Sequence, residues 1–292
     1  MRKNFSGSYV ALVTPFHEDG SVNFDKLKEL AAWHVEQGTD GIVVLGTTGE
    51  SSTMSHEEDD QVAACVIETV NGRIPVICGA GSNSTQTQLE KSRKYHDLGA
   101  DGLLLISPYY NKANDEGMYR HFAAVADTVD TPIILYNVPG RTGCSISPSV
   151  VARLAKHPNV AGIKEASGNI SYTAKIAKLV GDDFYLFSGN DDMIVPVLSL
   201  GGCGVISVWA NICPKACHDL VASWQAGDTA KALDIQLRYL DLINTLFCEV
   251  NPIPVKEAMN QMGMGVGGYR LPLCEISEAG RAQVARALEV LA

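Results

Sequence analysis

The sequence predicts an α/β protein in which eight parallel strands, each followed by a helix, close into a (β/α)8 TIM barrel. Eight short apolar runs rich in Val, Ile and Leu alternate with segments of helical periodicity. Successive runs begin about 25 to 30 residues apart, the length that a strand, a crossover helix and two short loops require. An open doubly wound sheet is disfavoured, because Thr14, Pro15 and Phe16 follow the first run where a phosphate-binding glycine loop is expected.

The predicted elements divide the chain into a barrel and a tail. The strands cover residues 9–14, 41–45, 74–79, 102–107, 132–137, 160–164, 184–188 and 203–208. The clearest helical patterns between them cover residues 23–37, 56–70, 85–98 and 171–180. Later helical patterns cover residues 215–224, 229–246, 254–262 and 277–291. Since only the first of these completes the eighth unit, we expect a barrel over residues 1–225 and a C-terminal helical extension packed on it over residues 226–292.

Composition and charge exclude several classes of partner. With 292 residues, of which 46% are hydrophobic, the chain can bury a large core. Its 23 basic and 33 acidic residues give a net charge of −10 without a dense Lys and Arg cluster, so no nucleic acid partner is expected. No apolar run reaches the roughly 18 residues that span a bilayer, and the N-terminal run, broken by Pro15, predicts a strand rather than a signal peptide. We therefore expect a cytoplasmic protein with no membrane contact.

Cysteine, histidine and glycine patterns do not predict a cofactor. The eight cysteines are scattered through apolar segments, which indicates reduced thiols rather than a disulfide framework. The tightest cluster, Cys213, Cys217 and His218, lacks a second ligand pair at a suitable spacing, and no catalytic metal is expected. The glycines of residues 263–268 fit a dinucleotide fingerprint formally, but they follow a predicted helix instead of a strand.

The sixth predicted strand ends in a lysine, Lys164. Catalytic groups of a barrel gather at the carboxyl ends of its strands, and lysine is rarely buried in an apolar strand. If this side chain points into the barrel mouth, burial favours the neutral amine, which can attack a ketone. The alternatives are a lysine that extends to the rim or one that pairs with Glu165.

Two other strand ends carry polar groups suited to a site. After the fifth strand, Tyr136 can transfer protons and Arg141 can hold a carboxylate with two hydrogen bonds. After the second strand, residues 46–52 include glycines that permit close approach, and Thr47 and Thr48 supply hydroxyl donors. This loop suits a carboxylate or a carbonyl oxygen.

Each of these positions also has a purely structural interpretation. Tyr136 can be a core residue, Arg141 a surface residue, and the second loop a cap for the helix that His56 opens. The adjacent Tyr109 and Tyr110, which follow the fourth strand, cannot both point the same way. One can face the site while the other packs or joins an interface.

Four separated motifs resemble those of a known family. They are GTTGE at 46–50, YYN at 109–111, YNVPGRT at 136–142 and GIKEAS at 162–167. In this order they resemble the dihydrodipicolinate synthase family of pyruvate-dependent class I aldolases, within the N-acetylneuraminate lyase superfamily. The resemblance extends from residues 11–15 to residues 251–256. It implies a barrel that condenses pyruvate with L-aspartate 4-semialdehyde to 4-hydroxy-tetrahydrodipicolinate, in lysine and diaminopimelate biosynthesis, without a metal or organic cofactor.

The resemblance also implies roles in the reaction itself. Lys164 is expected to form the imine with pyruvate. Tyr136, Thr48 and Tyr110 are expected to form a proton relay, in which Tyr110 reaches in from a neighbouring subunit. The chain is therefore expected to form a homo-oligomer, a tetramer made of two dimers.

Substrate-binding residues follow from the same resemblance. Thr47 and Thr48 are expected to hold the pyruvate carboxylate, and Arg141 the carboxylate of the incoming aldehyde. Gly189 and the carbonyl of Ile206 are expected to line the pocket.

Alternative functions remain open at this point. A sibling lyase that cleaves N-acetylneuraminate or a 2-keto-3-deoxy sugar acid would share Lys164 and Tyr136. Thr47 and the Gly140 and Arg141 pair favour the semialdehyde over sialic acid, but they do not separate the keto-deoxy sugar acids. A barrel that binds a keto acid without catalysis is an alternative from a different class.

The resemblance also bears on inhibition by lysine. Family members that lysine inhibits use a pocket at a dimer interface, for which the candidate residues are Ser51, His56, Asn83 and Tyr109. Asp59 stands where a second histidine is expected, and Thr87 stands where a glutamate is expected. Because the glutamate would pair with a lysine ammonium, we predict weak or absent inhibition.

Overall fold

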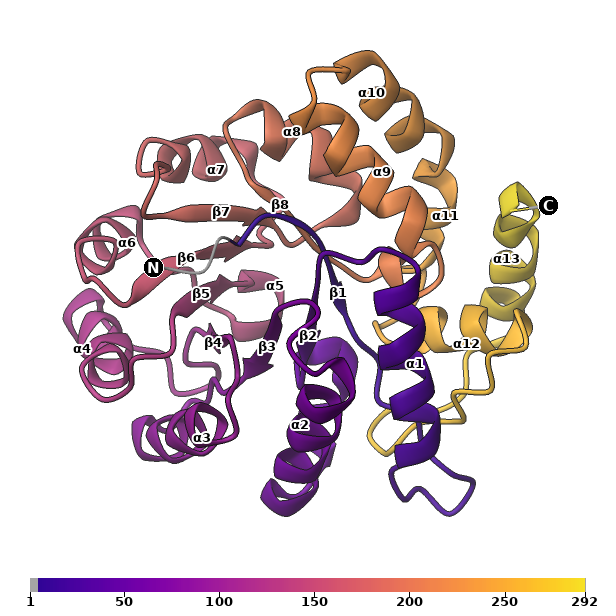
Figure 1. Cartoon of the computed structure of the whole chain (residues 1–292), viewed down its shortest axis with the longest axis horizontal. Helices are drawn as coiled ribbons and strands as arrows, with labels where there is room; N and C mark the ends of the chain where they lie inside the picture. The colour runs from indigo at the N-terminus through magenta and orange to yellow at the C-terminus, as the bar shows by residue number, and fades with distance from the viewer. Residues whose placement is uncertain (1–4, 292) are drawn as a thin grey trace. The chain divides into compact units, whose positions relative to one another are not determined.

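The computed structural model describes residues 5–291, and its eight strands follow one another in order in a closed parallel barrel, which confirms the predicted fold class (Figure 1). The strands are β1 Gly7–Ala11, β2 Gly41–Val44, β3 Val76–Gly79, β4 Gly102–Ile106, β5 Ile133–Asn137, β6 Val160–Glu165, β7 Tyr185–Ser188 and β8 Gly204–Ser207. Every predicted strand is present, and most ends agree within two residues.

The first strand differs most from its prediction, because it ends at Ala11 instead of Thr14. Beyond Leu12, the backbone N–H of Val13 donates to Asn211 Oδ1 at 3.1 Å, and the Thr14 hydroxyl donates to the Gly49 carbonyl at 2.6 Å. These residues are still buried, so the apolar pattern extends past the point where strand pairing stops.

The helices follow the predicted alternation and are mostly capped by polar side chains. They are α1 Phe24–Glu36, α2 His56–Val70, α3 Thr85–Asp97, α4 Asp115–Ala126, α5 Pro139–Thr142, α6 Pro148–Leu154, α7 Ile170–Ala177, α8 Ile194–Ser199, α9 Pro214–Gln225, α10 Thr229–Arg238, α11 Leu240–Thr245, α12 Ile253–Gln261 and α13 Glu278–Leu288. At α2, Ser55 accepts from the Glu58 N–H while Glu58 accepts from the Ser55 N–H, a capping box that fixes where the helix starts. None of the helices within residues 5–291 has the length and apolar character needed to cross a bilayer.

The segment predicted as one helix over residues 229–246 is two helices, so that prediction was wrong. The interruption lies at Tyr239, which ends α10 and precedes α11. Its ring packs on the Trp209 ring, with 5.0 Å between centroids. This contact joins the interruption to the turn that follows β8.

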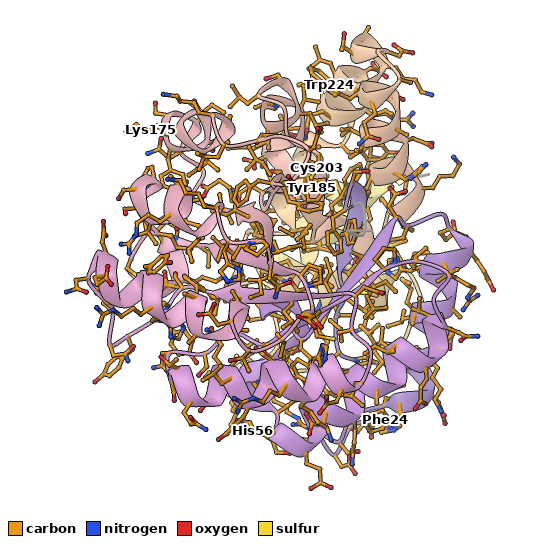
Figure 2. All side chains as sticks on the ribbon, turned by 60° about the vertical axis from the view of Figure 1, so that its left-hand side comes forward. Phe24, His56, Lys175, Tyr185, Cys203 and Trp224 are labelled. Carbon is orange, nitrogen blue, oxygen red and sulfur yellow. The ribbon has the colours of Figure 1, made fainter. Side chains whose placement is uncertain are left out.

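The chain divides into two compact units, and the first contains the segment that ends at Gly7 together with Pro75–Ile206. Its strands β3 to β8 pair in parallel with their neighbours. Figure 1 shows α3, α4, α6 and α7 on the outer side of these strands. Tyr185 and Cys203, labelled in Figure 2, lie at the N-terminal ends of β7 and β8.

The second unit contains Ser8–Ile74 and the chain from Ser207 onward. In it, β1 pairs with β2 in parallel, and α1 packs against α2. Figure 2 marks the first residues of these two helices, Phe24 and His56. The C-terminal helices α9 to α13 belong to the same unit, where α12 packs against α13.

Candidate active site

Lys164 lies on β6 and is buried, with only 6% of its surface exposed. It stands in register with Tyr136 on β5 and Phe187 on β7. Its Nζ lies 4.5 Å from the centre of the Tyr136 ring. This burial contradicts the alternative in which the lysine extends to the rim, and it places an amine beside a phenol.

Gly189, directly after β7, packs closely against Lys164 and the end of β6. Its N–H donates to the Glu165 carbonyl at 2.7 Å, which holds it against β6. A Cβ at this position would lie 2.6 Å from Ala166 Cβ and 3.1 Å from Lys164 Cε. No larger residue fits here without displacing the lysine or the backbone of β6.

Glu165 is bonded to neutral groups rather than to Lys164. Its carboxylate accepts hydrogen bonds from Asn137 Nδ2 and from the Ser167 N–H, both at 2.7 Å. Burial raises the pKa of Glu165, and these hydrogen bonds oppose the shift. The alternative in which Glu165 neutralises Lys164 is therefore wrong.

Asn137 connects β6 to the loop that carries Arg141. Its Oδ1 accepts from the Ile146 N–H at 2.9 Å, while its Nδ2 donates to Glu165. The Tyr172 hydroxyl donates to the Ile146 carbonyl at 2.6 Å, so both sides of this loop end are held. Arg141 lies within α5 and is exposed.

The two tyrosines after β4 are on the surface of the single chain. Tyr110 is 91% exposed and has a φ of 66°, and Tyr109 is 39% exposed. A left-handed conformation is unfavourable for an aromatic residue, so the loop imposes it. Tyr110 is therefore presented outward rather than packed on its own unit.

In the second unit, Thr47 and Thr48 lie in a single 3-10 turn, Thr47–Gly49. Thr48 is 3% exposed, and Thr47 is partly exposed. Leu45 and Glu50 flank the turn with φ values of 61° and 54°, which are unfavourable for side chains of their size. Such backbone persists only where the surroundings hold it in place.

A buried ion pair supplies part of that support. Lys256, from α12, is fully buried, and its Nζ donates to Glu50 Oε1 at 2.8 Å. The same ammonium donates to the Thr14 carbonyl at 3.0 Å and to the Gly268 carbonyl. Burial lowers the pKa of Lys256, and the Glu50 carboxylate opposes this effect. Helix α12 therefore holds the segments that follow β1 and β2.

Arg270 adds a second, partly exposed pair. Its guanidinium contacts both carboxylate oxygens of Glu58, at 2.6 and 2.9 Å, and its backbone N–H lies 3.4 Å from Glu50 Oε2. The hydrogen bond from Arg270 lowers the pKa of Glu58 to about 2. This pair fastens the start of α2 to the extension.

The remaining predicted residues have separate surroundings. Ile206 is fully buried on β8. Ser51 is partly exposed, His56 is exposed, and the Asn83 carbonyl accepts from Asn111 Nδ2 at 3.0 Å. Within the part of the chain that the structure describes, no three His, Cys, Asp or Glu side chains gather as metal ligands would.

Comparison with known proteins identifies the family. The sequence profile of the Dihydrodipicolinate synthetase family matches residues 4–291. The chain belongs to this family. It is 53% identical over 285 residues to the 4-hydroxy-tetrahydrodipicolinate synthase of Clostridium novyi, which covers 98% of this chain and 96% of the relative. It is 54% identical over 276 residues to the enzyme of that name from Clostridium tetani, and the match covers 94% of each chain.

A solved structure extends the likeness to three dimensions. The chloride-inhibited dihydrodipicolinate synthase from Acinetobacter baumannii, complexed with pyruvate, matches with a TM-score of 0.96 and 44% identity. The match covers 98% of this chain and 99% of that chain. The resemblance to the Dihydrodipicolinate synthetase family and the closed barrel are thereby confirmed.

Three residues that were not among the predicted site residues contact the predicted site loops of this family member. Asn251 donates to the Thr48 hydroxyl, Lys256 pairs with Glu50, and Arg270 pairs with Glu58. Only Lys256 gave a signal, because it is a lysine within the apolar segment around Val255. The same signal drew attention to Lys164.

Proposed function

We propose that the chain condenses pyruvate with L-aspartate 4-semialdehyde to 4-hydroxy-tetrahydrodipicolinate through a Schiff base on Lys164. The observation that carries this proposal is the buried Lys164 amine, which lies beside the Tyr136 ring. Membership in the Dihydrodipicolinate synthetase family and the pyruvate complex of the similar Acinetobacter enzyme support pyruvate as the first substrate.

The chemistry needs an amine and several proton transfers. The Lys164 amine adds to the pyruvate ketone, and loss of water leaves an imine. The protonated imine draws electrons from the neighbouring methyl group, so a methyl proton leaves and an enamine forms. The enamine carbon then attacks the aldehyde carbon. The amino group of the acceptor closes the ring on the imine carbon and releases Lys164 as a free amine.

We assign the remaining groups by the same logic. Tyr136, Thr48 and Tyr110 transfer the protons, because each carries a hydroxyl that can donate and accept. Thr47 and Thr48 bind the pyruvate carboxylate. Arg141 binds the carboxylate of the semialdehyde, for which an exposed guanidinium at a loop is suited.

Reductive trapping tests the imine. Incubation with pyruvate and borohydride is expected to leave a 1-carboxyethyl group on the Lys164 nitrogen, because borohydride reduces the imine to a secondary amine. Mass spectrometry of the digested protein locates this group. Lys164→Ala is expected to abolish both the adduct and the turnover. Lys175→Ala is the matched control, since Lys175 is an exposed lysine on the outer helix α7 (Figure 2). No adduct on Lys164 of the wild-type protein would overturn the proposal.

Two coupled assays test the substrate. Consumption of aspartate semialdehyde in the presence of pyruvate is expected, whereas release of pyruvate from N-acetylneuraminate or from a 2-keto-3-deoxy sugar acid is not. A faster lyase reaction would assign the chain to the sibling activity while leaving the Schiff base in place.

We further infer a homotetramer made of two dimers, in which Tyr110 completes the site of a neighbouring subunit. The 91% exposure and imposed backbone of Tyr110 support this role. Co-expression of Tyr110→Phe and Lys164→Ala chains tests it, because a mixed dimer has one site with both groups intact. At random pairing about one quarter of the wild-type activity is expected, although each variant alone is nearly inactive. No recovery would contradict a contribution between subunits.

We infer that lysine inhibits this chain weakly or not at all. Thr87, in α3, provides a hydroxyl where an anion is needed, and Asp59 is buried within α2. Turnover is expected to stay nearly constant as lysine is added, and strong inhibition at low micromolar lysine would contradict the inference.

We also infer a cytoplasmic location. The supporting observation is the state of the cysteines, since no two of them are joined by a disulfide bond within residues 5–291. Burial raises the pKa of the Cys78 thiol, which keeps it protonated and unreactive. Fractionation of the native cell with an antibody to the protein tests the location.

A further inference from the structure

Asn251 reaches Thr48 from the far end of the sequence. It lies between α11 and α12, and its Nδ2 donates a hydrogen bond to Thr48 Oγ1 at 3.0 Å, across a separation of 203 residues. Both side chains are buried, with exposures of 5% and 3%. A hydrogen bond between two buried neutral groups fixes the orientation of both.

Other groups hold the shape of the Thr48 loop. The Thr14 hydroxyl donates to the Gly49 carbonyl, directly after Thr48. The next residue, Glu50, is held by the ammonium of Lys256. The bond from Asn251 is different, because it ends on the hydroxyl itself and not on the backbone of the turn.

The chemistry of the two groups determines the direction of the bond. An amide N–H can only donate, so Thr48 Oγ1 must accept from Asn251. The proton of Thr48 must then point toward a different acceptor. We infer that Asn251 is a positioning residue that directs the Thr48 hydroxyl proton into the relay.

This inference rests on the proposed relay role of Thr48. A relay hydroxyl must give its proton in one direction, and a hydroxyl free to rotate spends part of its time pointing elsewhere. The donor from Asn251 also stabilises the negative charge that develops on Oγ1 as the proton leaves. Asn251 therefore acts on the rate of proton transfer through Thr48 without contacting the reacting atoms itself.

Two substitutions at Asn251 distinguish its effect on the direction of the Thr48 hydroxyl proton from its effect on packing. Asn251→Asp keeps the shape but replaces the donor with a carboxylate oxygen, so the Thr48 hydroxyl turns toward residue 251. We expect kcat to fall roughly 10- to 100-fold, with a smaller change in the KM for pyruvate. Asn251→Leu removes the donor without adding an acceptor, and a smaller fall is expected. A residue that only fills space predicts the reverse order, and that order would overturn the inference.

A control variant tests whether the fall in kcat comes only from weaker packing of the C-terminal part of the chain. Asn260, in α12, also donates through Nδ2, to the Gly267 carbonyl at 2.9 Å, and accepts from the Val266 N–H. Asn260→Asp therefore loses an amide hydrogen bond, in this case an exposed one, from a nearby part of the chain. Its kcat is expected to stay within about twofold of wild type. An equal loss of kcat in both aspartate variants would overturn the role of Asn251.

Borohydride trapping on Lys164 separates this inference from the proposed function. If the wild-type protein forms no adduct, the Schiff-base proposal fails. If the adduct forms and Asn251→Asp retains full kcat, only the inference about Asn251 fails. If the adduct forms in both proteins while kcat falls in the variant, the inference is supported.

A double-mutant cycle covers the case in which Asn251→Asp does not fold. Asn251→Leu is then compared in the wild-type protein and in Thr48→Val, where the hydroxyl is absent. We expect Asn251→Leu to lower kcat in the first background and to have little further effect in the second. Equal losses in both backgrounds would overturn the inference.

Discussion

Two buried glutamates lie within two of the four motifs, Glu50 in GTTGE and Glu165 in GIKEAS, and they are stabilised in opposite ways. Glu165 is next to Lys164, and the hydrogen bonds to its carboxylate come from Asn137 and Ser167, which are both neutral. Glu50 ends the turn that carries Thr48, and its carboxylate is paired with the ammonium of the fully buried Lys256. In the first unit, neutral hydrogen-bond donors stabilise the Glu165 carboxylate. In the second unit, a full positive charge stabilises the Glu50 carboxylate.

The two carboxylates therefore differ in how far their surroundings tolerate a change of charge. Dipoles can hold either protonation state of Glu165, and burial already shifts its pKa upward. A buried ion pair is less tolerant, because loss of either partner leaves an unpaired charge in an apolar interior. The turn with Thr48 therefore depends on charge balance, while the end of β6 depends on hydrogen-bond geometry.

Lys256→Met is expected to give the largest effect, because it strands the Glu50 carboxylate. We expect a loss of about 3 to 5 kcal/mol in the free energy of unfolding, measured by urea denaturation. Adding Glu50→Gln to this variant removes the stranded charge and is expected to recover part of the loss. A double variant that is less stable than Lys256→Met alone would contradict the charge-balance explanation.

Glu165→Gln is expected to have a smaller effect, about 1 to 2 kcal/mol, since one of the two hydrogen bonds to residue 165 is lost. The pH dependence gives the sharper test. Because the pKa of Glu165 is raised on folding, its contribution is complete below the unfolded pKa and is lost as pH rises through the folded pKa. The deficit of Glu165→Gln relative to wild type should therefore shrink as pH rises across this window. A deficit that grows with pH would show that the dipoles hold the ionised form instead.

The strand order and most strand ends could be predicted from sequence, because buried parallel strands give continuous apolar runs at regular spacing. The end of β1 could not be predicted, because Val13 and Thr14 are buried like the strand residues before them. They differ from the strand in their hydrogen bonds, which join them to Asn211 and Gly49. The break at Tyr239 was missed because the helical pattern continues across it from residue 229 to residue 246. The apolar pattern of the sequence thus predicts which residues are buried, but not the residue at which a strand or helix ends.

The site was only partly predictable. Lys164, Tyr136 and Thr48 were predicted because barrel strands end on one side, so polar residues at strand ends are expected to belong together. Asn251 and Lys256 were missed because their partners are 203 and 206 residues away, and no local pattern marks such a pair. Asn251 in particular is an ordinary polar residue in a segment between helices. Its proposed role follows only from the atom that its amide contacts.

Arg270→Gln is expected to give the smallest effect of the three substitutions. Its pair with Glu58 is partly exposed, with side-chain exposures of 18% and 29%. We expect a loss of about 1 kcal/mol at neutral pH. The pKa of Glu58 is lowered to about 2, so the stability it contributes is present above its unfolded pKa and is lost as pH falls toward 2. The variant should therefore approach the wild-type stability in acid.

The matched control is Arg120→Gln, which breaks an exposed pair with Glu116 on α4 and is expected to leave the free energy of unfolding nearly unchanged. If both arginine variants lose the same amount, Arg270 is only a surface charge, and Lys256 alone carries the electrostatic support of the Thr48 turn. If Arg270→Gln loses more, and loses it above the unfolded pKa of Glu58, the charge balance extends from the buried pair to the start of α2.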